Sequence, residues 1–178
     1  RSNGDVVLKE IPMVDQGPKG YCVPATFERY LRFMEVPADM YALAMIGGTN
    51  EGGGTSVHGM IEASGNLALR YGRKMIELKD DVSIRNVKKY IDQGMPVMWV
   101  MFSGKSYNDS VNKYTKAKTD AGADWEAQQT TTADAAHIQV DHSAAHICMI
   151  IGYNEKFNEF AVSDSWGPRF AERWIPVD

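Results

Sequence analysis

VDQGPKGYCVPAT, residues 14–26, is the stretch from which the rest of the chain can be interpreted. Its two glycines and Pro18 favour a loop over regular structure. From Thr26 onward, apolar side chains recur at three- and four-residue spacing, which predicts an amphipathic helix that ends near Glu35. The charged residues between the apolar positions of this helix are Glu28, Arg29 and Arg32. Cys22 is therefore expected near the N-terminus of the helix.

This position favours nucleophilic chemistry at Cys22. The unpaired N–H groups and the positive end of the helix dipole stabilise a thiolate at a helix N-terminus. Gln16, a few residues upstream, carries a side-chain amide that can donate a hydrogen bond beside the sulfur, as in an oxyanion hole. The alternative is that Cys22 is a small buried side chain, which is the commoner role of a lone cysteine, so partners elsewhere must decide between the two.

Such partners occur near the C-terminus. Residues 145–154 form a short apolar run that predicts a buried strand, with His146 at its start. Residues 159–167 predict another strand, with Asp164 at its end and Trp166 two residues later. An imidazole can take the proton of a thiol, and a carboxylate on its other nitrogen fixes the tautomer. Trp166 is expected to shield the bond between carboxylate and imidazole from water.

These residues, in this order, closely resemble the papain-like cysteine peptidases. An aspartate in the third place is more similar to the double-glycine leader peptidase branch, which comprises the peptidase domains of bacteriocin exporters and their stand-alone relatives. Residues 11–16, 54–56 and 91–97 extend the similarity, whereas the region around 103–145 departs from it. The exporter role is not expected here, because the chain contains no membrane-spanning or nucleotide-binding segment.

The resemblance implies a set of site residues. By position it implies Gln16 for the oxyanion hole, Cys22 as nucleophile, His146 as base and Asp164 as the residue that orients the base. It also implies that the loop before residue 57 borders the cleft. The expected substrate-binding residues are Gly54 and Thr55 from this loop, together with Trp166.

Composition limits the classes of function. The 178 residues suffice for one domain with a real core, and 44% hydrophobic with 24% charged residues is typical of a globular protein. The net charge of -4 gives no electrostatic footprint for nucleic acid, and no apolar run reaches the roughly 20 residues of a membrane span. The polar start without methionine favours a trimmed, secreted or extracytoplasmic chain. No cofactor is expected, and the oligomeric state is open.

Two further observations compete with this interpretation. Cys148 is expected to be buried core, but a disulfide between it and Cys22 would abolish nucleophilic chemistry. A metal cluster is the other alternative, and its candidate ligands are Asp134, His137, Asp141 and His142. Their spacing matches no compact zinc motif, so no metal is expected. His58 is expected to be solvated.

The remaining segments predict further helices and strands. Helices are expected over 40–46, over 57–71 with a cap at Thr55 or Ser56, and over 84–93 with a cap at Ser83. The expected strands are 73–78, a central strand at 96–102, a final strand at 169–177, and an edge strand or extended arm within 6–14. Residues 103–144 form a long polar insertion, in which Trp125 and residues 130–132 either belong to a lid or docking surface or have no functional role.

Together these features predict an α+β fold in which helices pack against a mostly antiparallel sheet, with the active-site cleft between the two parts. The expected organisation is one papain-like domain over residues 1–178, carrying a polar insertion at about 103–145. The expected function is hydrolysis of peptide bonds in a peptide or protein substrate. The alternatives are another thiol acyltransferase, such as a transglutaminase-like enzyme or an amine acetyltransferase, and an inactive peptide-binding module.

Overall fold

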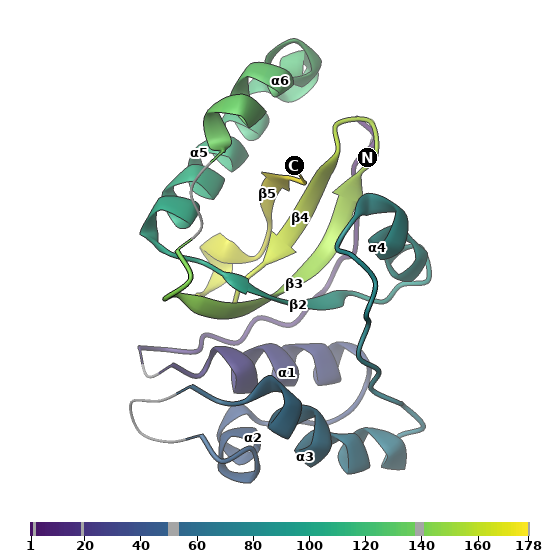
Figure 1. Ribbon diagram of the computed structural model, residues 1–178. Helices are drawn as coiled ribbons and strands as arrows, with labels where there is room; N and C mark the ends of the chain where they lie inside the picture. The colour runs from purple at the N-terminus through teal and green to yellow at the C-terminus, as the bar shows by residue number, and fades with distance from the viewer. Residues whose placement is uncertain (2, 19, 50–53, 138–140, 178) are drawn as a thin grey trace. The chain divides into compact units, whose positions relative to one another are not determined.

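The computed structural model describes residues 1, 3–18, 20–49, 54–137 and 141–177 (Figure 1). The chain divides into two compact units. The first comprises Arg1–Leu8, Asp81–Ser163 and Glu172–Asp178, and the second comprises Lys9–Asp80 and Asp164–Ala171. Helices together with an antiparallel sheet confirm the predicted α+β class. The single-domain organisation stays a prediction.

The sheet belongs to the first unit and is built around β3. Its strands are β1 (Val6–Val7), β2 (Val97–Phe102), β3 (Ala145–Asn154), β4 (Glu159–Ser163) and β5 (Arg173–Pro176). Every pairing is antiparallel, in the order β1-β3-β4-β5, and β2 pairs with β3 beside β1. The expectation that 96–102 is a central strand is therefore wrong. Within the described residues β2 has one partner, and Val100 is 57% exposed.

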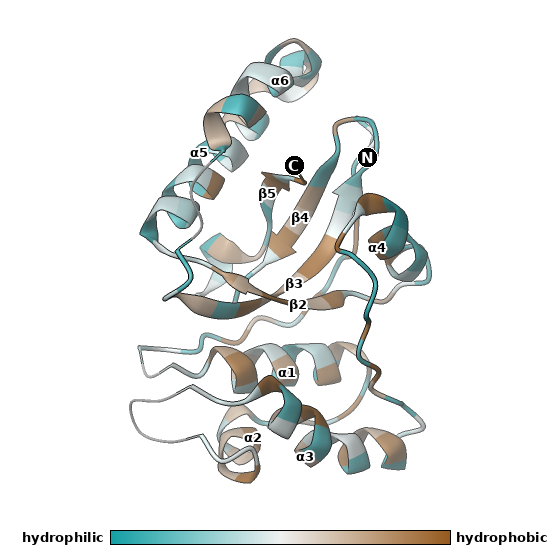
Figure 2. Ribbon diagram, viewed as in Figure 1, coloured by the Kyte–Doolittle hydropathy of each residue, from teal (hydrophilic) through white to brown (hydrophobic). Residues whose placement is uncertain are grey.

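The core of the first unit contains apolar side chains from the sheet and from two helices. Helix α4 (Ile84–Ile91) begins where Ser83 accepts a hydrogen bond from the backbone N–H of Asn86, as the capping pattern predicts. Figure 2 shows its hydrophobic and hydrophilic sides, and hydrophobic stretches of β3 and β4. Core residues from these elements are Ile84, Val87, Ile91, Cys148, Ile150, Phe160 and Val162. The predicted burial of Cys148 is confirmed.

Gly152 and Tyr153, at the end of β3, have structural roles. A Cβ atom on Gly152 would lie 2.3 Å from the carbonyl oxygen of Val6, so only glycine lets β1 pair this closely. The Tyr153 hydroxyl donates a 2.7 Å hydrogen bond to Asp92 at the end of α4. Burial, and then this hydrogen bond, raise the pKa of Tyr153 to about 12. The pair therefore joins β3 to β1 and to α4.

The polar insertion is helical. It forms α5 (Lys105–Ala121), a 3₁₀ turn (Gly122–Asp124) and α6 (Trp125–Ala136), and Figure 1 shows both helices beside β5. The Thr115 hydroxyl accepts a 2.8 Å hydrogen bond from the N–H of Trp174 and lies 3.3 Å from its carbonyl oxygen, to which it donates. A side chain of α5 thus occupies backbone groups on the outer edge of β5.

A buried polar network fastens α5 and α6 to the sheet. Lys118, only 6% exposed, donates to Asp5 at 2.9 Å and also to Glu159, and its ammonium lies 3.5 Å from the centre of the Trp174 ring.

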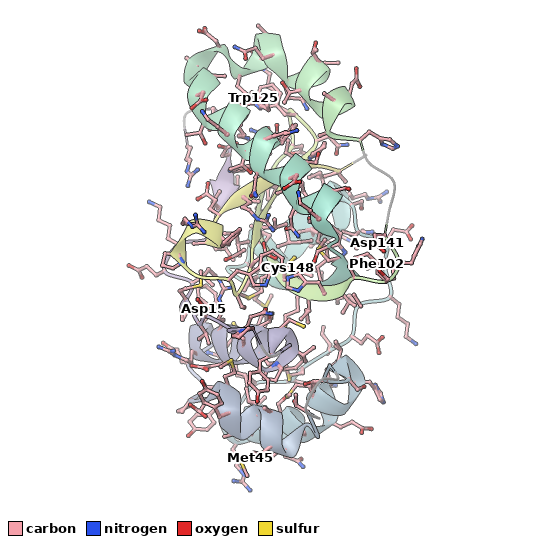
Figure 3. All side chains as sticks on the ribbon, turned by 90° about the vertical axis from the view of Figure 1, so that its left-hand side faces the viewer. Asp15, Met45, Phe102, Trp125, Asp141 and Cys148 are labelled. Atoms are coloured by element: carbon pink, nitrogen blue, oxygen red, sulfur yellow. The ribbon has the colours of Figure 1, made fainter. Side chains whose placement is uncertain are left out.

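Glu159 is fully buried and also accepts from the Tyr114 hydroxyl (2.7 Å) and the Trp125 indole N–H (2.8 Å). Further donors to Asp5 are Asn3 and Asn154. Trp125, labelled in Figure 3, is thus a buried anchor, and the lid or docking role of the insertion, including residues 130–132, stays a prediction.

The second unit consists mainly of three helices that pack on one another: α1 (Cys22–Phe33), α2 (Met40–Ile46) and α3 (Val57–Arg70). Asp39 caps α2 and Ser56 caps α3, and both side chains accept backbone hydrogen bonds. The cap at Ser56 is one of the two that the sequence predicts. A 3₁₀ turn, Pro168–Phe170, completes the unit, so the final strand begins later than expected.

The strand expected at 73–78 is not formed. Most side chains of this segment are exposed and no backbone ladder includes it. Alternating hydrophobicity gives a stable strand only where a neighbouring strand supplies hydrogen-bond partners, and the segment has none among the described residues.

Candidate active site

The second unit contains the junction between loop and helix at which Cys22 lies. Cys22 is the first residue of α1, and the preceding Tyr21 makes no side-chain capping bond. No acidic residue occupies the first turn, and Pro24 lies there without cost because first-turn N–H groups have no partner within the helix. The positive φ angles of Gly17 (63°) and Gly20 (72°) let the loop turn into the helix. Cys22 is half-buried and its thiol is free.

Gln16 is held by a backbone hydrogen bond, and its side-chain oxygen is buried. Its N–H donates a 2.8 Å hydrogen bond to the carbonyl oxygen of Ser165. Its side-chain Oε1 is buried without a hydrogen-bond partner among the described residues. A buried unpaired carbonyl is uncommon in folded proteins and is one of the features that mark functional sites.

The segment that follows β4 carries Asp164 and packs against the Gln16 loop. Asp164 is buried, and its N–H donates to the carbonyl oxygen of Phe170 at 2.9 Å. Gly167 has φ of 94°, and a Cβ there would lie 3.4 Å from Asp15 Oδ2, so this position also requires glycine. The ring of Trp166 meets Phe170 edge-on at 5.5 Å. Gln16, Cys22 and Asp164 thus belong to the same compact unit.

His146 belongs to the first unit and lies in β3, the strand that follows the insertion. It is the second residue of β3, is buried, and lies opposite Met101 in the register with β2. Cys148 is two residues further along the same strand face, and its thiol lies 3.6 Å from the sulfur of Met101. Within the described residues neither Cys22 nor Cys148 forms a disulfide. The roles of His146 and Asp164 as base and orienting residue stay predictions.

The predicted substrate-binding residues differ in exposure. Gly54 is exposed, whereas Thr55 is buried and its hydroxyl is hydrogen-bonded to that of Thr49. Trp166 is half-buried. The predicted solvation of His58 is confirmed: its side chain is largely exposed, 3.5 Å from Glu62. The glycines just before Gly54 lie outside the described residues.

The candidate metal ligands are used in local structure. Asp141 accepts hydrogen bonds from the hydroxyl (2.6 Å) and N–H (3.0 Å) of Ser143, which hold the pKa of Asp141 below its ordinary value. The His142 ring packs edge-on against Phe102 at 4.8 Å, and His137 ends α6. Across the described ranges, no three His, Cys, Asp or Glu side chains are grouped so as to hold a metal ion.

Two charged residues of α1 have surroundings that the amphipathic pattern did not predict. Glu28 and Arg29 are buried, and Glu28 accepts a 2.7 Å hydrogen bond from the N–H of Met40 at the start of α2. Arg29 donates hydrogen bonds to Pro12 and Ser165. The sequence does contain one signal for Arg29, because a helical residue seven positions after Cys22 lies on the same helix face.

The described residues contain no helix long and apolar enough to span a membrane.

Among curated proteins no sequence matches the chain. A crystal structure of a candidate C39-like peptidase from Bacillus anthracis resembles the fold with a TM-score of 0.58 at 13% identity, covering 98% of this chain and 88% of that one. The family model described as "Peptidase_C39 like family" matches residues 8–178, nearly the whole chain. This chain therefore belongs to the Peptidase_C39 like family, the C39 branch of the papain-like cysteine peptidases.

Proposed function

We propose that this protein is a cysteine peptidase that hydrolyses peptide bonds with Cys22 as nucleophile. The observation that carries the proposal is the junction at Cys22. It combines a free, partly accessible thiol with an uncapped helix N-terminus, and the loop before it carries Gln16, whose side-chain Oε1 is buried without a hydrogen-bond partner among the described residues. Membership of a peptidase family supports the reaction class.

In the proposed reaction, the Cys22 thiolate attacks the carbonyl carbon of the scissile bond. The backbone N–H of Cys22 and the Gln16 amide stabilise the oxyanion that forms. Protonated His146 gives its proton to the leaving amine as the C–N bond breaks, and Asp164 orients the imidazole. Water then attacks the thioester, His146 takes its proton, and the carboxylic acid leaves Cys22.

The first test is alkylation of the protein with iodoacetamide at pH 6.5, where ordinary thiols are almost fully protonated, with the modified residue identified by mass spectrometry. We expect Cys22 to react faster than free cysteine, and His146→Ala to slow it at least tenfold. His58→Ala is the matched control, since this exposed histidine should not affect the rate. Buried Cys148 should remain unmodified. Equal rates for Cys22 and free cysteine would contradict the nucleophile role.

The second test is cleavage of a mixed peptide library that includes sequences with two consecutive glycines, the substrate class implied by the leader peptidase resemblance. We expect cleavage by the wild type and none by Cys22→Ser. Transfer of the acyl group to an added amine in place of water would instead indicate an acyltransferase. Peptide binding without any product would indicate a binding module.

A further inference from the structure

Arg29 is a fully buried cation on the face of α1 that begins with Cys22. Cys22, Thr26 and Arg29 are spaced at i, i+4 and i+7, so they form one line along the helix. Arg29 is 0% exposed. Burying a guanidinium is costly, and an apolar side chain of similar size can fill such a position without that cost. The value of an arginine here must therefore come from what its N–H groups bind.

The guanidinium joins two segments that are far apart in sequence. Its Nε donates a 2.8 Å hydrogen bond to the carbonyl oxygen of Pro12, and its Nη1 donates to the hydroxyl of Ser165 at 3.2 Å. The Thr26 hydroxyl lies 3.3 Å from the same Ser165 oxygen. A planar fork can serve two acceptors at once, which the single ammonium of a lysine cannot do with the same geometry.

Both acceptors of the Arg29 guanidinium are connected to Gln16. Pro12 lies four residues before it on the same arm, and the Ser165 carbonyl accepts the Gln16 backbone N–H at 2.8 Å. Arg29 therefore fixes the arm on one side of Gln16 and, through Ser165, the backbone of Gln16 itself. All these residues belong to the second unit.

We propose that Arg29 is a positioning residue for the oxyanion hole, which holds the Gln16 amide in place through Pro12 and Ser165. This inference rests on the proposed function. A displacement of about 1 Å in a catalytic group can cost about a hundredfold in rate. Arg29 would therefore affect the reaction step that generates an oxyanion, and not the formation of the nucleophile.

Two reagents separate these steps on the same sulfur. Acylation of Cys22 by p-nitrophenyl acetate forms a tetrahedral oxyanion, releases p-nitrophenolate and leaves a thioester, whereas alkylation by iodoacetamide displaces iodide without an oxyanion. For Arg29→Lys we expect acylation to fall about ten- to a hundredfold and alkylation to change less than twofold. Gln16→Ala should lower acylation about 10²–10³-fold.

The double variant Arg29→Lys with Gln16→Ala gives the decisive result. If Arg29 acts through Gln16, the double variant should acylate no more slowly than Gln16→Ala alone, because interacting residues are not additive. Arg32→Lys is the matched control, since Arg32 is 47% exposed and pairs with Glu28. Losses that multiply, or a parallel fall in acylation and alkylation, would overturn the positioning role. A wild-type Cys22 no faster than free cysteine with either reagent would instead overturn the proposed function.

Discussion

Replacing Lys118 with methionine should be one of the most destabilising single changes in the first unit. The substitution removes the cation that bonds both Asp5 and Glu159, while a side chain of similar length still packs on Trp174. Removing one partner of a buried ion pair costs about 3–5 kcal/mol, because the remaining charge is uncompensated. Glu159 keeps its bonds from Tyr114 and Trp125, so we expect a loss near the lower limit, about 3 kcal/mol.

The matched control is Lys116→Met, two residues away on the same helix. Lys116 is 75% exposed and pairs with Asp120, and such surface pairs contribute about 0–1 kcal/mol. Urea denaturation gives the free energy of unfolding, and amide hydrogen exchange reports whether α5 and α6 open first. Adding Glu159→Gln to Lys118→Met should recover part of the loss, since one uncompensated charge disappears. Equal effects of the two lysine substitutions would refute the argument that the buried network anchors the insertion.

Three further predictions concern the first unit. Gly152→Ala should destabilise the protein by about 1–3 kcal/mol and raise amide exchange in β1, because the added methyl meets the Val6 carbonyl. Burial raises the pKa of Asp5, but hydrogen bonds from its neighbours outweigh burial and keep that pKa below the ordinary value. Stability from Asp5 is thus present at neutral pH and lost as pH falls below about 4, and acid unfolding of Asp5→Asn should show a shallower slope there. For Tyr153 the raised pKa reverses the sign: its contribution is lost as pH rises from 10 toward 12, and ultraviolet titration of Tyr153→Phe should lack this late ionisation.

Elements with strong local signals were predictable from the sequence. The serines that cap α3 and α4, the start of α2 and the apolar run of β3 each depend on neighbours within a few residues. The errors concern long-range pairing. Whether β2 is central or at the edge depends on how many strands join it, and the alternating segment 73–78 has no strand beside it. Neither fact is encoded in the segment itself.

The candidate site divides in the same way. Cys22 near a helix start followed from turn residues and periodicity, and in the structure Cys22 is the first residue of α1. The burial of Arg29 and Trp125 was not predicted, because the polar groups that make it favourable, Ser165 and Glu159, lie more than thirty residues away in sequence. An amphipathic pattern assigns every charged residue to the solvent-exposed face. It therefore does not predict buried polar contacts.

The hydrogen bonds of Thr115 to Trp174 have a consequence for solubility. Unpaired N–H and C=O groups on an outer strand are a template on which other chains add and aggregate. Because α5 occupies that edge of β5, a shortened protein without residues 105–136 would not be a stable minimal version of this protein. It would expose a strand edge and leave the carboxylates of Asp5 and Glu159 without the Lys118 cation, and we expect it to precipitate during expression.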